Sequence, residues 1–117
     1  MPRLDPIPEF DLAAELSWAR MGVPGEMLPI SLIEGDYLYK EDNGYRLWGS
    51  TCMSQDGYSG RIYLALRNGR PSRTSLVHEL VHVELKRNTG DADSAHEWNG
   101  WDDRVDEIND YLEDQGL

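Results

Sequence analysis

The segment that most constrains the fold of this chain runs from Ser75 to Arg87 and reads SLVHELVHVELKR. Its hydrophobic residues surround a helical axis almost completely, which predicts a helix that is buried on most of its sides. Lys86 and Arg87 suit the last turn of such a helix, and Gly90 can adopt the left-handed conformation of a cap. A chain of 117 residues has room for one domain with one modest core. We therefore expect a single domain, residues 1–117, with this helix near its centre.

Among the apolar residues in the first two turns of this helix stand His78, Glu79 and His82. Burying such groups costs on the order of several kcal/mol unless they are paired or ligated. Residues i and i+4 share a helix face with Cβ atoms roughly 5–6 Å apart, so His78 and His82 can bind one zinc ion together. Glu79 lies about 100° around the helix from His78, where it can hydrogen-bond a water held by the metal. The pattern predicts a zinc site with Glu79 as the general base.

A third ligand must come from elsewhere, and His96 is the only other histidine in the chain. We expect the helix to end near Asn88, about 9 Å beyond His82 at a rise of ~1.5 Å per residue. The eight residues from Asn88 to His96 can span up to about 26 Å, so the chain can return to the histidine pair. His96 is therefore the predicted third zinc ligand.

Carboxylates near this loop are the alternative third ligands. Asp91 comes only three residues after Asn88 and would have to double straight back, whereas Asp93 can reach the site but matches an imidazole pair less well. Acidic residues further along also lie at a spacing from His82 that permits coordination: Asp102, Asp103 and Asp106. Spacing alone leaves these carboxylates open as rivals of His96.

The rest of the chain predicts an α+β fold. Apolar residues at helical spacing predict a helix from about Pro8 to Met21 and a C-terminal helix that begins near Trp101. Asn43 and Gly44 are a strong hairpin signal, and the QDGYSG segment indicates a turn. The predicted strands are Ile30–Ile33, Tyr37–Lys40, Tyr45–Trp48 and Arg61–Arg67. We expect a compact fold in which a small antiparallel or mixed sheet packs on the N-terminal, histidine-bearing and C-terminal helices.

The HELVH motif on a predicted helix resembles the active site of the zincin metallopeptidases. Because thirteen residues separate His82 from His96, the chain looks most like a minimal SprT-like zinc metallopeptidase domain. The resemblance covers about Arg61 to Trp101. It implies a zincin-like fold, a protein or peptide substrate, Glu79 as the base and three zinc ligands: His78, His82 and His96.

The chain departs from related families at several positions. Glu97 follows His96, where SprT-like proteins usually have Gly, and Leu85 and Asn88 stand where metzincins have Gly and His. The single cysteine, Cys52, excludes both an intrachain disulfide and a Cys-based zinc cluster, and we expect it to be a small buried residue. SprT-like proteins also tend to carry basic nucleic-acid-binding surfaces or added zinc ribbons, and this sequence shows neither. The DNA-linked function of some members is therefore not carried over to this chain.

Other parts of a peptidase site follow less directly from the sequence. In zincins a strand beside the active-site helix binds the substrate, which pairs with it as an added antiparallel strand. Arg61–Arg67 is the predicted edge strand for this role, unless the sheet pairs it on both sides. Tyr58 and Tyr63 are the tyrosines considered as oxyanion stabilisers. We expect Trp98 and Trp101 to pack over the ligand loop as part of the core.

Negative charge is concentrated near the C-terminus. The net charge is −11, and residues 91–117 contain ten acidic side chains and one base, Arg104. Such a surface repels phosphates, which disfavours nucleic-acid binding. It predicts a solvated acidic helix and leaves open docking on a basic protein partner. No apolar run could span a membrane, and the N-terminal residues show no signal-peptide core, which favours a cytoplasmic protein.

Together, these patterns favour a zinc-dependent peptidase that acts through a metal-activated water. Two other functions stay open at this point. One is a metal-stabilised acidic binding or inhibitory protein that mimics a nucleic acid or docks on a basic partner. The other is a zinc amidase that acts on a cell-wall peptide.

Overall fold

The structure is a computed structural model that describes residues 4–5, 8–23, 25–35, 37–66 and 72–116. The helices of this described part are α1 (Pro8–Arg20), α2 (Arg73–Thr89) and α3 (Trp101–Asp114). Its strands are β1 (Leu4–Asp5), β2 (Ile30–Ile33), β3 (Tyr39–Lys40), β4 (Arg46–Leu47), β5 (Gly49–Met53) and β6 (Gly60–Ala65). The predicted α+β class is confirmed.

Four of the strands form one mixed sheet in the order β1-β2-β6-β5. β2 and β6 run parallel, with Ile30 opposite Ile62, and β5 pairs antiparallel with β6, with Met53 opposite Gly60. Alternate residues of the two central strands are almost fully buried: Ile30, Leu32, Ile62 and Leu64. The sheet therefore presents one apolar face on which helices can pack.

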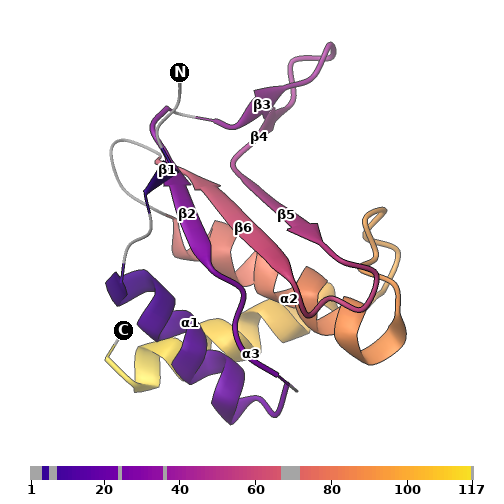
Figure 1. The fold of residues 1–117 in the computed structure, drawn as a ribbon. Helices are drawn as coiled ribbons and strands as arrows, with labels where there is room; N and C mark the ends of the chain where they lie inside the picture. Colours follow the sequence, from indigo (N-terminus) through magenta and orange to yellow (C-terminus); the bar gives the residue numbers. More distant parts are fainter. Residues whose placement is uncertain (1–3, 6–7, 24, 36, 67–71, 117) are drawn as a thin grey trace.

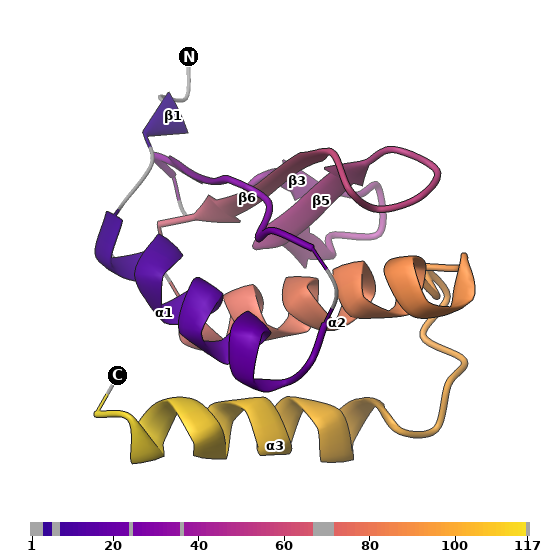
Figure 2. The ribbon, with the colours of Figure 1, turned by 60° about the horizontal axis from the view of Figure 1, so that its bottom comes forward.

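The helices lie on one side of this sheet in two layers (Figures 1 and 2). α1 and α2 pack against the sheet, and α3 lies beyond α2 and runs antiparallel to it (Figure 2). One buried cluster fills the space between the sheet, α1 and α2, with Trp18, Leu76 and Leu80 among its members. A second cluster lies between α2 and α3 and includes Val77 and Val81. Because α2 is covered on both sides, its sequence is apolar almost all round.

Local signals fix both ends of α2. At the N-terminus, the hydroxyl oxygen of Ser72 accepts a hydrogen bond from the backbone N–H of Ser75 at 3.3 Å. At the C-terminus, Gly90 adopts a left-handed conformation with φ of 83°, and its N–H donates to the carbonyl oxygen of Lys86 at 2.9 Å. The predicted position of the helix and its glycine cap are confirmed. No helix among the described residues is long and apolar enough to cross a membrane.

The predicted hairpin is also confirmed, although its strands are shorter than the sequence indicates. β3 and β4 form a two-stranded sheet that projects from the body of the protein (Figure 1). The N–H of Glu41 donates to the carbonyl oxygen of Tyr45 at 2.8 Å, and the turn contains Gly44 with φ of 88°. A three-residue loop with a left-handed glycine is a common hairpin connection.

Two predictions about the sheet are wrong. β6, which occupies most of the predicted Arg61–Arg67 strand, has a neighbour on each side, so it is not the edge strand; Arg67 itself lies outside the described residues. The edge on the side of α2 is instead β5 (Gly49–Met53), whose residues lack the alternation of apolar and polar side chains that marks a strand in a sequence. Cys52 is exposed, not buried, because it alternates along β5 with Thr51, whose side chain points to α2.

Candidate metal centre

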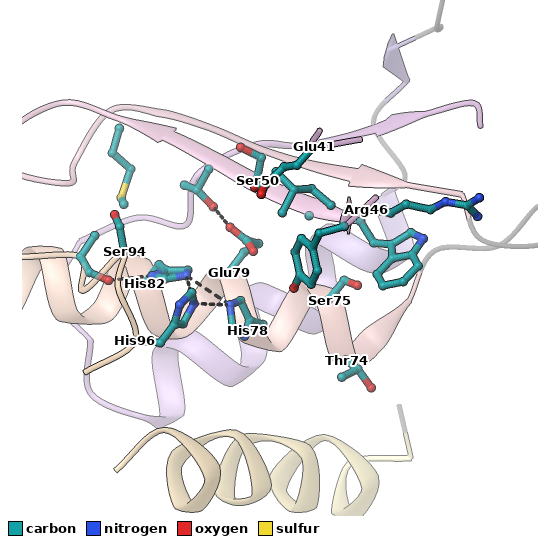
Figure 3. Close-up of a pocket in the computed structure, with 17 residues that line it drawn as sticks. Glu41, Arg46, Ser50, Thr74, Ser75, His78, Glu79, His82, Ser94 and His96 are labelled. Atoms are coloured by element: carbon teal, nitrogen blue, oxygen red, sulfur yellow. Dashed lines mark hydrogen bonds between the residues drawn. The ribbon is translucent and has the colours of Figure 1, made fainter. Parts of the chain in front are cut away.

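Three imidazole rings meet beside the central helix. His78 and His82 project from α2, and His96 comes from the loop that connects α2 to α3. The Nε2 atoms of His78 and His96 lie 2.9 Å apart, and each lies 3.2 Å from Nε2 of His82. Figure 3 shows the three rings pointing toward a common centre. The structure thus brings together all three histidines that the sequence predicts as metal ligands.

The spacing and protonation of these rings fit a metal ion. A tetrahedral ion with bonds of ~2.0–2.1 Å places its nitrogen ligands about 3.3 Å apart, close to the observed separations. Nδ1 of His82 lies 2.6 Å from the carbonyl oxygen of Ala92, an acceptor that requires the proton on Nδ1. Nε2 of His82 therefore offers a lone pair to the centre of the triad. Three imidazoles suit zinc, copper, iron and nickel alike, so the donors by themselves do not select the metal.

The environment of His78 favours the form that binds metal. Burial lowers the pKa of this imidazole to about 4, and the neighbouring His82 and His96 act in the same direction. The neutral ring is the metal-binding form. Near neutral pH the imidazole of His78 is therefore already neutral, and it does not have to lose a proton to bind a metal ion.

A single carboxylate organises the loop that carries His96. Asp93 accepts hydrogen bonds from the backbone N–H groups of Glu97 at 2.9 Å and Trp98 at 3.0 Å, and from the indole N–H of Trp101 at 2.7 Å. These bonds, led by the one from Trp101, lower the pKa of Asp93. The carboxylate is therefore engaged by the loop and does not join the triad.

The other carboxylate rivals do not reach the site either. Among the described residues, the group of potential ligands that lie close together consists of the three histidines alone. Asp102, Asp103 and Asp106 are exposed on α3. Asp91 is exposed, and its Oδ1 accepts a hydrogen bond from the N–H of Asp93 at 2.8 Å. The geometry therefore favours His96 over each carboxylate.

The two tryptophans near the loop behave differently. Trp101 is only 8% exposed and belongs to the cluster between α2 and α3, so its predicted core position is confirmed. Trp98 is 42% exposed, so its predicted core position is wrong. A Cβ atom at Gly100 would collide with the ring of Trp98, which shows that this ring lies over the backbone before α3 and leaves its outer face in solvent.

Glu79 is held between α2 and the edge strand. Its side chain is buried, and its Oε1 accepts a hydrogen bond from the hydroxyl of Thr51 on β5 at 2.7 Å. A Cβ atom at Gly49 would lie 3.1 Å from Oε2, so the glycine leaves room for the carboxylate. Burial raises the pKa of Glu79 to about 7, although Thr51 and His96 act to lower it. Thr51 is a site residue that the sequence did not indicate, because its partner is 28 positions away.

A groove of about 940 Å³ opens in front of the triad. It lies between α2, the hairpin and the edge strand (Figure 3). Its walls include Tyr45, Thr51, His78, Glu79 and His96. Neither Tyr58 nor Tyr63 is among the residues that line it, so the structure does not support either as an oxyanion stabiliser. Tyr58 instead packs against the guanidinium of Arg87, which lies 4.5 Å from its ring centre.

Comparisons of the chain with known protein families, with curated proteins and with solved structures found no match. The resemblance to the zincins therefore stays a prediction from the motif, and the geometry of the three histidines stands on its own.

Proposed function

We propose that this protein is a zinc-dependent peptidase of the zincin type, similar to SprT-like domains. The observation that carries the proposal is the convergence of three imidazole nitrogens within 2.9–3.2 Å of one another, with Glu79 next to His78 on the same groove. A metal site that served only to stabilise the fold would have no need of a buried carboxylate such as Glu79 in the groove beside the histidines.

The residues divide the work between holding a cation and moving protons. A zinc ion bound by His78, His82 and His96 would polarise a substrate carbonyl and make a water more acidic. Glu79 takes the proton of the attacking water and passes it to the departing amine. The hydrogen bond from Thr51 fixes one oxygen of the carboxylate, which leaves Oε2 for proton transfer. A bound cation would oppose the effect of burial and return the pKa of Glu79 toward acidic values.

The edge strand supports a peptide as the substrate. β5 is the last strand of the mixed sheet, and Gly49, Ser50, Thr51 and Met53 all line the groove. An extended peptide can pair with the backbone of such an edge, so that its carbonyl groups pass in front of the triad. In this arrangement the strand serves both the substrate and the base, because Thr51 also binds Glu79.

The test is the Glu79→Gln variant. We expect it to keep zinc and the melting temperature of the wild type, because Gln has the same shape and retains an oxygen that can accept from Thr51. Hydrolysis should fall by at least about 100-fold, since the general base is lost. A peptide library, incubated with zinc-loaded protein and analysed by mass spectrometry, provides the measurement.

Glu113→Gln serves as the matched control, because Glu113 is exposed on α3 outside the groove and its loss should leave cleavage unchanged. Turnover by Glu79→Gln at the wild-type rate would refute the proposed mechanism. If the zinc-loaded wild type cleaves no library peptide but releases fragments from cell-wall peptides, the protein is an amidase and not a general peptidase.

A further inference from the structure

The C-terminal helix begins directly beneath the histidine triad. Trp101 is its first residue, and the indole ring contacts all three imidazoles. It stacks on His78 at a ring-centre distance of 4.7 Å and an angle of 24°. It meets His82 at 4.6 Å and 66°, and His96 at 5.0 Å and 52°. One aromatic side chain thus forms the floor of the whole site.

The same indole holds the loop in place through its polar edge. Its N–H donates to Oδ2 of Asp93 at 2.7 Å. The carboxylate of Asp93 in turn accepts the backbone N–H groups of Glu97 and Trp98, which follow His96. The backbone N–H of His96 donates to the carbonyl oxygen of Asp93 at 2.9 Å. A continuous set of contacts therefore runs from α3 through Asp93 to the third imidazole.

This loop needs such support because of its backbone conformation. Asp93 and His96 both have a φ of 56°, in the left-handed region that side chains other than glycine seldom adopt. Residues stay in that region when surrounding contacts fix them there. Loss of the contacts would allow the loop to relax and would move Nε2 of His96 away from the other two nitrogens.

We propose that Trp101 and Asp93 form a positioning pair that holds His96 in its metal-binding position and couples the docking of α3 to metal binding. The inference rests on the metal site of the proposed function but does not depend on hydrolysis. It goes beyond packing, since a tryptophan that only filled the core between α2 and α3 would affect stability and leave metal affinity alone.

Trp101→Phe separates these two roles. Phenylalanine keeps an aromatic ring in the buried cluster but removes the N–H that binds Asp93. Loss of a partner that orients a metal ligand weakens metal binding by about 10–100-fold. We expect that loss for Trp101→Phe, measured by competition with a zinc-sensitive dye. We also expect the visible absorption of the cobalt-loaded protein to change, because the position of one nitrogen ligand changes.

Two controls complete the experiment. Trp98→Phe changes an exposed tryptophan whose hydrogen bond to Asp93 comes from the backbone N–H, which the substitution keeps, so zinc affinity and the cobalt spectrum should stay as in the wild type. Ile108→Val removes a methyl group from the same cluster as Trp101, so the melting temperature should fall without a change in zinc affinity.

Wild-type affinity and an unchanged cobalt spectrum in Trp101→Phe would overturn the inference and leave the proposed peptidase intact. An Ile108→Val variant that loses as much affinity as Trp101→Phe would overturn it too, because general destabilisation would then explain both. A wild type that binds metal without cleaving any peptide would refute only the proposed function. A wild type that binds neither zinc nor cobalt would refute both.

Discussion

The two parts of the histidine triad are held in place by different means. His78 and His82 are four residues apart on α2, so the repeat of the helix alone brings their rings to the same face. His96 lies 14 positions after His82 in a loop and depends on Asp93, Trp101 and its own left-handed backbone. The helical pair is set by local structure, whereas the third ligand is set by contacts between distant segments.

This difference has a consequence for how firmly each ligand is held. α2 is buried between the sheet and α3, so moving the backbone that carries these two histidines would require the core to open. His96 is exposed, and a few hydrogen bonds fix its loop. We infer that the helical pair provides a permanent frame and that His96 determines how tightly a metal is bound.

The largest effect is expected from removing the ligands themselves. His82→Ala and His96→Ala should each lower zinc affinity by at least about 100-fold, since loss of a residue that merely orients a ligand already costs 10–100-fold. Competition with a zinc-sensitive dye measures both variants. Asp102→Asn and Asp103→Asn are the controls, and both should bind zinc like the wild type because these side chains are exposed on α3.

Zinc binding by His96→Ala at the wild-type level would show that His96 is not a ligand. If Asp102→Asn or Asp103→Asn lost affinity in the same experiment, a carboxylate of α3 would complete the site in place of His96. The helical pair would survive either result.

An intermediate effect is expected on the thermal stability of the wild type. A ligand that binds only the folded state stabilises it by RT ln(1 + [L]/Kd), or about 1.4 kcal/mol at ten times Kd. Calorimetric melts should therefore shift upward by several degrees with zinc and return with a chelator. His96→Ala should show little shift at the same zinc concentration. Identical melts of zinc-loaded and zinc-free wild type would mean that the metal does not bind the folded state in preference to the unfolded chain.

The smallest effect is expected from a substitution at the end of α2, which should change the free energy of unfolding but not zinc affinity. Gly90 has a φ of 83°, and a Cβ atom there would meet nothing within 4 Å, so Gly90→Ala should cost about 1 kcal/mol from backbone conformation alone. Denaturant unfolding measures this cost. Zinc affinity should not change, because Gly90 lies beyond the last turn that carries a ligand. A large loss of affinity would mean that the end of α2 and the loop act as one unit.

The sequence predicted the parts of the molecule that local patterns determine. The position of α2, its cap at Gly90 and the hairpin turn at Gly44 follow from apolar spacing and glycine conformation. The HELVH motif located the helical pair for the same reason. The reach of the chain favoured His96 but did not exclude Asp102 or Asp103, because a distance limit carries no information on the path of a loop.

Features set by pairing between distant segments were missed. β5 lacks the alternation of apolar and polar residues that marks a half-buried strand, so the sequence did not reveal the edge of the sheet. The exposure of Cys52 and the contact between Thr51 and Glu79 depend on that strand. Likewise, apolar spacing placed Trp101 in the core but could not show that its N–H binds Asp93.

The place of Trp101 at the start of α3 has a consequence for the order in which the protein is made. A ribosome releases the chain from its N-terminus, so the HELVH segment emerges while the residues after it are still being added. The floor of the site and the hydrogen bond to Asp93 exist only once Trp101 has emerged and α3 has docked on α2. A nascent chain that has emerged through His96 but not through α3 therefore carries all three histidines without the contacts that hold the third one in place.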